Sequence, residues 1–409
     1  MQTIAYHKRR TMSTRGGQCM SERVESKVWA LEKCSGCGMC VALCSKGMLY
    51  WDEVDHPARE LREKRLGLSR LTLDSCTFCQ KFCEEGCPRL EEEWTALLPR
   101  HLVSARTMGI VKSDEPNDVI KNLLVAALSA GLIDGVLMMD MNPWTLEPEA
   151  RVATSVREIV DSLGGQYLWT PVLSALNQAI FEGGLCNLVI VGTPCVAEAV
   201  RALRSSDNER LRPYQDAIRL TIASFCTGVY FPTLVNDFLT GEMGLAPHSV
   251  KRLMANPRAG KLVALLWDGS SKEIPVEKVE KYTRRGCAVC DDYLGESADI
   301  AVGTVGAKDG YCTLITRSQV GDICLQNAVN FGLVETVDEV DEVALAKAKE
   351  EKERRERAQA FDKLLVLALD ALGDPRKRAE IRQEYVRLYE IERPAEREKE
   401  RCYVTCGGC

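Results

Sequence analysis

The chain has 409 residues, enough for two or three domains, and its 45% apolar and 27% charged residues are ordinary for a soluble globular protein. A net charge of −6 argues against nucleic acid or an anionic membrane surface as the main partner, because both attract basic proteins. The longest apolar stretch, Leu123 to Met139, is interrupted by Gly131 and Asp134, and no apolar segment follows the basic residues near the start. We therefore expect a cytoplasmic protein with no membrane span.

Cysteine is the unusual part of the composition, with 19 residues. In an exported chain so many cysteines would indicate disulfides, but nothing in the sequence directs export. Eight of them form two tight groups near the start, and such short separations suit a metal cluster better than cross-links between distant segments.

Four segments are expected along the chain. They are a polar, flexible N-terminus at 1–28, a ferredoxin-like domain at 29–92, an α/β core at 105–340 and a charged helical tail at 341–409. The tail could be a solvated surface helix or a docking arm for a partner subunit. Its terminal cysteines, Cys402, Cys406 and Cys409, could belong to a frayed tail or could complete a metal site together with a partner.

The ferredoxin-like domain holds two groups of four cysteines, Cys34, Cys37, Cys40 and Cys44, and Cys76, Cys79, Cys83 and Cys87. Their spacing is that with which a short loop binds a [4Fe–4S] cluster, and Pro88 ends the second group as in ferredoxins. In two-cluster ferredoxins the fourth cysteine of each group binds the other cluster. We therefore assign Cys87 to the first cluster and Cys44 to the second. Structural zinc is the alternative for paired Cys-x2-Cys motifs, and the closing Cys-Pro disfavours it.

The core shows helical and strand patterns in alternation. We expect helices at Asp118–Ala130 and Val196–Leu203, strands at Gly135–Met139, Leu188–Val191, Ala217–Ser224 and Ala298–Val302, and a hairpin at Leu262–Ile274. Parallel strands place their carboxyl ends along one edge of a sheet, where ligands usually bind.

A third, dispersed set of cysteines follows these strands: Cys195, Cys226, Cys287 and Cys290. Cys195 lies where a strand turns into a helix, so helix amides face its thiol and favour the thiolate. Four thiols at one sheet edge could hold a third cluster. A buried cysteine is more often a small apolar side chain, however, and one Cys-x2-Cys could be redox-active instead.

With Gly192-Thr193-Pro194-Cys195, Phe225-Cys226, Cys287-Ala288-Val289-Cys290 and the run Ala298 to Gly306 in this order, the chain resembles the family of coenzyme F420 hydrogenase/dehydrogenase beta subunits. The resemblance covers roughly residues 30–340. With two cysteine groups in front, the arrangement is most similar to the input subunit of reduced-F420 dehydrogenase, and it also occurs in F420-dependent sulfite reductase.

The resemblance implies FAD beside a cluster held by the dispersed set of cysteines, and hydride exchange with coenzyme F420. It implies a flavin-binding loop with Gly303, Thr304, Gly306 and Gly310, and places Thr193 and Tyr167 near the flavin. Lys281, Arg284, Arg285 and Lys308 could bind the anionic groups of FAD or F420. Three positions depart from the family pattern near this pocket: Asp114 to Asp118, Gln166 and Val196.

The implied protein is an oxidoreductase subunit of a larger anaerobic complex, with FAD and three [4Fe–4S] clusters. A hydride carrier moves two electrons and a cluster moves one, so a flavin must stand between them. Two alternatives remain open. The same flavin–cluster module could act on another substrate, or the chain could be a flavin-free relay subunit like a polyferredoxin.

Overall fold

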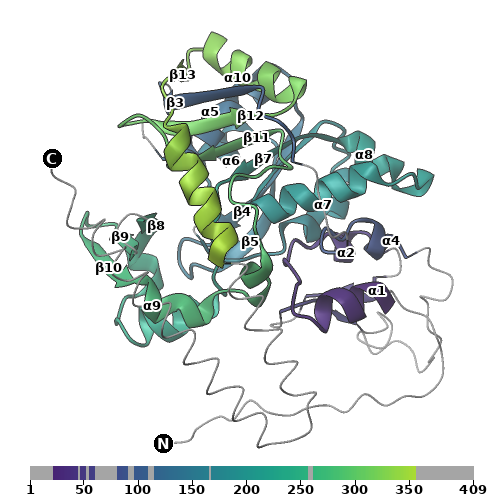
Figure 1. Cartoon of the computed structure of the whole chain (residues 1–409), viewed down its shortest axis with the longest axis horizontal. Helices are drawn as coiled ribbons and strands as arrows, with labels where there is room; N and C mark the ends of the chain where they lie inside the picture. Colours follow the sequence, from purple (N-terminus) through teal and green to yellow (C-terminus); the bar gives the residue numbers. More distant parts are fainter. Residues whose placement is uncertain are drawn as a thin grey trace, which may run out of the picture. The chain divides into compact units, whose positions relative to one another are not determined.

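The structure is a computed structural model that describes residues 22–44, 47–51, 55–59, 81–90, 96–108, 115–164, 167–256 and 261–355. Contacts divide the chain into one unit that ends at Glu353 and a second that begins at Arg354. The helices and strands labelled in Figure 1 belong to the first unit.

An eight-stranded sheet lies at the centre of this unit. Its strands are β3 (His101–Thr107), β4 (Gly135–Met141), β5 (Pro148–Ala153), β6 (Leu188–Gly192), β7 (Ile218–Ser224), β11 (Ile300–Gly303), β12 (Cys312–Thr316) and β13 (Val334–Val337). Their order is β13-β3-β12-β11-β7-β6-β4-β5. The inner strands β11, β7, β6 and β4 are parallel, whereas β5 at one side and β12, β3 and β13 at the other pair antiparallel.

Helices cover both faces of the sheet. The helices of the core are α5 (Pro116–Ser129), α6 (Val156–Asp161), α7 (Pro194–Ser205), α8 (Arg212–Ala217) and α10 (Gln319–Asn330), with short η3 (Val172–Ala175), η4 (Gln178–Glu182) and η5 (Glu209–Leu211). Apolar residues of α5, α6 and α10 pack on one face, and those of α7, α8 and η3 on the other. Successive residues of β4 serve the two layers, Val136 and Met138 facing the first and Leu137 the second, as the pleat requires.

A smaller antiparallel sheet, in the order β10-β9-β8, has a core of its own. Its elements are β8 (Val250–Asn256), β9 (Lys261–Leu266) and β10 (Ser271–Pro275), surrounded by η6 (Leu234–Thr240), η7 (Pro247–Ser249), α9 (Val276–Val279), η9 (Glu280–Tyr282) and η10 (Arg285–Val289). The hairpin of β9 and β10 turns at Asp268 and Gly269, and Gly269 has φ +85°, which a side chain would strain.

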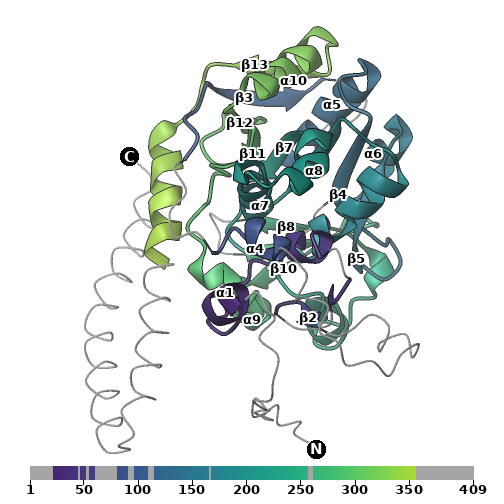
Figure 2. The same ribbon diagram turned by 90° about the vertical axis from the view of Figure 1, so that its right-hand side faces the viewer.

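The N-terminal module packs under α7, as Figures 1 and 2 show. It comprises α1 (Glu22–Val24), η1 (Glu25–Trp29), α2 (Met39–Ala42), β1 (Leu49–Tyr50), β2 (Ala58–Arg59) and α4 (Phe82–Glu85). Met39, Ala42 and Leu43 join the apolar cluster beneath the large sheet. Asn177 donates to the carbonyl of Ala42 at 2.8 Å, so the module is fixed to the core by polar contacts as well.

The elements predicted in the core are confirmed, with shifts of a few residues at their ends. The predicted helix at Val196 begins at Pro194, which puts Cys195 in its first turn. The four predicted strands, β4, β6, β7 and β11, are parallel as expected, whereas the edge strands β5, β12, β3 and β13 pair antiparallel and have no counterpart in the sequence prediction. Of the predicted tail, residues 342–355 are helical, and its remainder lies outside the described residues.

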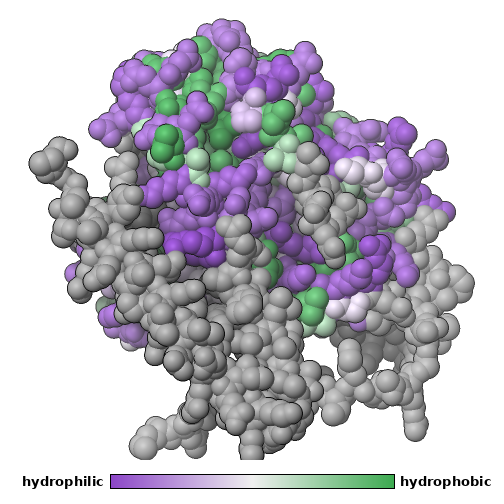
Figure 3. Space-filling view, viewed as in Figure 1, coloured by the Kyte–Doolittle hydropathy of each residue, from purple (hydrophilic) through white to green (hydrophobic). Residues whose placement is uncertain are grey.

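The surface of the described part is mostly hydrophilic, and Figure 3 shows apolar side chains gathered at the end that carries α10 and β3. Ile323 and Phe331 are large apolar residues exposed there. Among the described helices, none combines the length and the apolar character that a bilayer crossing needs.

Candidate metal centres and an adjoining cavity

Four cysteines of the N-terminal module, Cys34, Cys37, Cys40 and Cys87, lie close enough to influence one another electrostatically. Burial raises the pKa of Cys40, and Cys37, Cys34 and Cys87 raise it further. Burial, followed by the neighbouring Cys37, also raises the pKa of Cys34 to about 11 and that of Cys87 to about 12. This N-terminal quartet is the set predicted to share the first cluster.

Backbone amides point at these sulfur atoms. Amides of Gly36, Met39 and Arg89 donate to the thiols of Cys34, Cys37 and Cys87. Gly36 and Gly38 have φ of +75° and +91°, the left-handed conformation that lets a short loop turn its amides inward.

The second predicted set of the module is described only in part. The amide of Met48 lies 3.3 Å from the sulfur of Cys44, and Cys83 influences the pKa of Cys40. Cys76 and Cys79 lie outside the described residues. A second cluster therefore stays a prediction.

The dispersed cysteines of the core, Cys195, Cys226, Cys287 and Cys290, also come together, and we call them the core quartet. Burial raises the pKa of Cys226 to about 12, with Cys287 and Cys290 as further causes. Burial and the neighbouring Cys290 raise the pKa of Cys195 as well. The strands place these residues: Cys195 follows β6, Cys226 follows β7, and η10 carries or adjoins the other two.

Hydrogen-bond donors surround the core quartet too. The hydroxyl of Thr193 lies 3.0 Å from the sulfur of Cys195. Amides of Gly228 and Val229 donate to Cys226 and Cys287, so the loop after β7 serves two of the four thiols.

Two buried arginines stand between the quartets. Arg89 pairs with Glu198 of α7 at 3.3 Å, with side chains 12% and 5% exposed, and it hydrogen-bonds to Cys290. Arg284 is 1% exposed and lies over the ring of Trp169, with 4.0 Å between its guanidinium carbon and the ring centroid. Burial lowers the pKa of Arg284, whereas Cys34 of one quartet and Cys287 of the other oppose that shift.

The two quartets touch through their backbones. A Cβ atom at Gly286 would lie 2.0 Å from the carbonyl oxygen of Cys34, so the two loops meet with no space between them. Trp169 donates to the carbonyl of Gly36 at 2.9 Å, and the amide of Leu173 donates to that of Cys37 at 2.9 Å. The loop of the N-terminal quartet is thus fixed against the core.

The residues of both quartets fit iron–sulfur clusters. Within the described ranges, no three Cys, His, Asp or Glu side chains are arranged to hold a single metal ion. A cubane spreads its ligands more widely, because each thiolate binds a different iron. Nitrogen atoms of Arg89 and Arg284 are buried without a hydrogen-bond partner, as expected for donors that face an anionic group. Buried thiols, inward amides and buried cations together match such a group.

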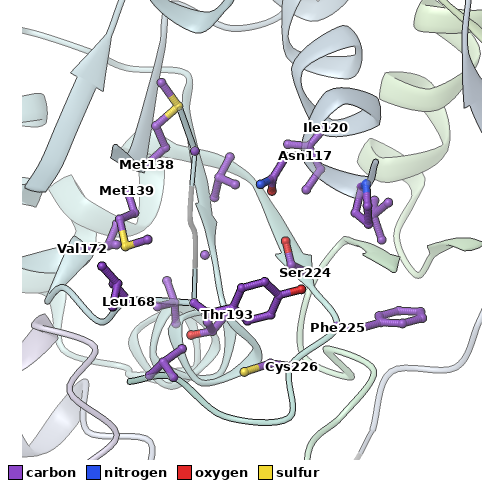
Figure 4. Close-up of a pocket in the computed structure, with 18 of the residues that line it drawn as sticks. Asn117, Ile120, Met138, Met139, Leu168, Val172, Thr193, Ser224, Phe225 and Cys226 are labelled. Carbon is purple, nitrogen blue, oxygen red and sulfur yellow. The ribbon is translucent and has the colours of Figure 1, made fainter. Parts of the chain in front are cut away.

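A cavity of about 250 Å³ adjoins the quartets at the carboxyl ends of β6, β7 and β11. Figure 4 shows Met138, Met139, Leu168 and Val172 along one side, Asn117, Ile120 and Ser224 along the other, and Cys226 at the bottom of the view. Cys195 and the loop Ser35–Cys37 also line the cavity. The cavity is therefore next to both quartets.

Half of the predicted cofactor-binding residues line this cavity: Thr193, Tyr167, Gly303 and Thr304. The other half lie elsewhere: Gly306, Gly310, Lys281 and Arg284. Gly306 packs on Leu345, where a Cβ atom would lie 2.8 Å from the leucine, and Lys281 pairs with Glu242 at 3.4 Å. Of the other basic candidates, Lys308 pairs with Glu339 and Arg285 with Asp55.

The sequence patterns missed other residues at the cavity. Lys121 of α5 and Arg252 of β8 line it, and they are far apart in the chain. Trp169, which with Tyr167 is a candidate for the flavin pocket from sequence, does line the cavity, and it also donates to the carbonyl of Gly36. No sequence signal could have identified Arg252, because its strand belongs to the separate small sheet.

Three family models match the chain. The N-terminal and C-terminal models of the coenzyme F420 hydrogenase/dehydrogenase beta subunit match residues 110–177 and 185–342, and the 4Fe-4S dicluster domain matches residues 33–89. The cysteines of the core quartet all lie in the C-terminal match.

Relatives agree with these models. An uncharacterized protein of Methanocaldococcus jannaschii is 35% identical over 78% of this chain and 92% of its own length. The beta subunit of the coenzyme F420 hydrogenase of Methanosarcina barkeri is 30% identical over 57% of this chain and 80% of its own. One of the subunits of the F420H2 dehydrogenase of Methanosarcina mazei is 28% identical over 71% of this chain and 80% of its own.

A solved structure shows the same fold. A chain from the F420-reducing [NiFe] hydrogenase complex of Methanosarcina barkeri superposes with a TM-score of 0.58 and 26% identity, over 64% of this chain and 91% of that chain. Family models, relatives and fold agree, and the chain belongs to the family of coenzyme F420 hydrogenase/dehydrogenase beta subunits.

Proposed function

We propose that the chain is an iron–sulfur flavoprotein subunit that passes electrons between coenzyme F420 and one-electron carriers, through FAD and three [4Fe–4S] clusters. Its relatives include subunits named for F420 hydrogenase, F420H2 dehydrogenase and F420-dependent formate dehydrogenase, as well as F420-dependent sulfite reductase, all oxidoreductases. Such subunits work in complexes, so we expect other redox subunits as partners.

The observation that carries the proposal is the contact between three sites. Cys195 and Cys226 of the core quartet line the cavity. The same quartet touches the N-terminal quartet where Gly286 meets Cys34. A group bound in the cavity would thus stand next to one cluster, and that cluster next to another.

The cavity has the character that a flavin ring needs. A bound FAD would supply the exchange between hydride transfer and single-electron transfer. Met138, Leu168 and Val172 would exclude water from the ring, and the hydroxyl groups of Thr193 and Ser224 offer hydrogen bonds at its edge. Gly303 makes room for the ring of Phe225, which also lines the cavity, because a Cβ atom would lie 1.9 Å from that ring.

Positions near the cavity depart from the family pattern, so the identity of the substrate needs a test of its own. Val196 and the stretch Glu115–Asn117 line the cavity, and Gln166 lies outside the described residues. These side chains would meet the flavin or coenzyme F420, whereas the cysteines of the quartets are unaffected.

Anaerobic purification of the full chain, followed by iron and flavin assays and a visible spectrum, tests the cofactors. We expect about twelve irons and one FAD for each chain, four irons for each cluster. Iron without flavin would favour the relay role and overturn the flavin proposal. Stopped-flow mixing with reduced F420 then tests the substrate: rapid bleaching of the flavin supports F420, and no bleaching at any F420 concentration rejects it.

A further inference from the structure

A buried lysine reaches the core quartet from outside the family match. That match ends at residue 342, and residues 342–355 form the helix drawn in yellow-green in Figure 1. Lys352 of this helix is 4% exposed. Its ammonium group donates to the carbonyl oxygens of Cys226 and Asp292, both at 2.7 Å, and lies 3.5 Å from the sulfur of Cys290.

The helix is anchored along its length. Near its start, the amide of Asp341 donates to the carbonyl of Gly306 at 2.8 Å, and Leu345 packs on the same glycine. One turn before Lys352, Lys349 forms an ion pair with Glu296. Lys352 is therefore held in place by contacts that do not involve the quartet.

The buried charge of Lys352 needs negative charge close to it. A buried ammonium costs several kcal/mol, on the order of the penalty for any buried ion, unless an anion compensates it. Its two carbonyl partners are neutral, and its third partner is the sulfur of Cys290, which would be a thiolate in the proposed cluster.

Other charged groups face the same site from different elements. Arg89 contacts Cys290 from the N-terminal module, and its partner Glu198 lies on α7. The carboxyl group of Asp292 receives amide hydrogen bonds from Gly295 and Glu296 at 2.7 and 2.9 Å, and it also acts electrostatically on Lys352. Lys352 is distinct among these groups in joining the Cys226 loop to the Cys290 loop.

We infer that Lys352 is a positioning residue that raises the reduction potential of the core cluster and holds its two ligand loops together. The inference rests on the proposed core cluster. Reduction adds one electron to the cluster, and a fixed cation within hydrogen-bond range of a ligand sulfur stabilises the more negative state.

Potentiometric titration of the anaerobic full-length protein, followed by electron paramagnetic resonance, tests this inference. The variant Cys287→Ser identifies the core signal as the one it removes. In Lys352→Met we expect the ratio of reduced to oxidised core cluster at a fixed potential to fall at least tenfold, which is about 59 mV for a one-electron couple. The N-terminal signals should keep their midpoints, and Lys352→Arg should restore most of the shift.

Lys347→Met is the matched control, because it removes a lysine of the same helix whose side chain is exposed. It should leave the core midpoint unchanged. If Lys352→Met fails to assemble the core cluster, Lys352→Gln, which keeps a donor without the charge, is titrated in its place. An unchanged midpoint in a neutral variant with full iron refutes the inference. A wild-type protein without a core signal refutes the proposed cluster itself, a separate result.

Discussion

Gly286→Ala should separate the two quartets without removing a ligand. Gly286 is buried in η10, one residue before Cys287, where its missing side chain leaves room for the N-terminal loop. A Cβ atom there would lie 2.0 Å from the carbonyl oxygen of Cys34 and 2.7 Å from its carbonyl carbon. Both atoms belong to the backbone, so the loop as a whole must move.

The size of the effect follows from that contact. Non-bonded heavy atoms prefer separations of roughly 3.5 Å or more, so the Cys34 loop must retreat by over 1 Å or η10 must distort. Overpacking of this kind costs about 1–3 kcal/mol. A change of that size lowers the population of the docked arrangement by a factor of about 5 to 150.

Two measurements on the anaerobic protein test the prediction. Hydrogen exchange should be faster than in the wild type at the amide of Leu173 and at the amides of residues 34–38, because Leu173 donates to the carbonyl of Cys37 across this contact. Rapid freezing during reduction should show electrons reaching the N-terminal cluster later, with iron content unchanged. Arg285→Ala is the control, since that side chain is 61% exposed and its ion pairs contribute at most about 1 kcal/mol. Unchanged exchange and unchanged transfer in Gly286→Ala would refute the reasoning.

Three further predictions concern the cluster ligands, the buried ion pair and the cavity. Cys287→Ser should lose about a third of the iron, four of about twelve atoms, whereas the exposed Cys186→Ser should keep all of it by iron assay. Glu198→Gln removes the carboxylate partner of the buried Arg89 and should lower the unfolding free energy by about 3–5 kcal/mol in anaerobic urea titration. A loss under 1 kcal/mol would contradict it. Burial lowers the folded-state pKa of Lys121 below its unfolded 10.5, so the unfolded state holds more protons and stability should rise with pH up to 10.5. Lys121→Met should lack that rise, and an equal rise in both proteins would show that Lys121 is not its source.

Much of the core could be predicted because its signals are local. Apolar runs indicated β6 and β7, and helical spacing indicated α5. The antiparallel edge strands could not be predicted, since β3 pairs with β12 about two hundred residues further along the chain. Pairing at such separations depends on tertiary packing.

The residues of the site also fall into those with a local sequence signal and those without one. Short cysteine spacings indicated the N-terminal quartet, and the strand ends indicated the core quartet. Their role as ligands stays a prediction. The cations around them have no such pattern, because an arginine or lysine looks the same in sequence whether it is buried or solvated. Arg284 is a candidate for binding an anionic group of FAD or F420, and it lies over the ring of Trp169 between the quartets.

The buried arginines also explain why the N-terminal module and the core form one unit. Arg89 belongs to the N-terminal module and pairs with Glu198 of the core. Arg284 belongs to the core and donates to the carbonyl of Cys34 in the N-terminal module. Each arginine would be a buried, poorly balanced charge if the modules came apart or if the thiolates near it were neutral. In the proposed function, cluster assembly would supply the negative charge that stabilises this interface, and metal binding would be coupled to docking of the modules.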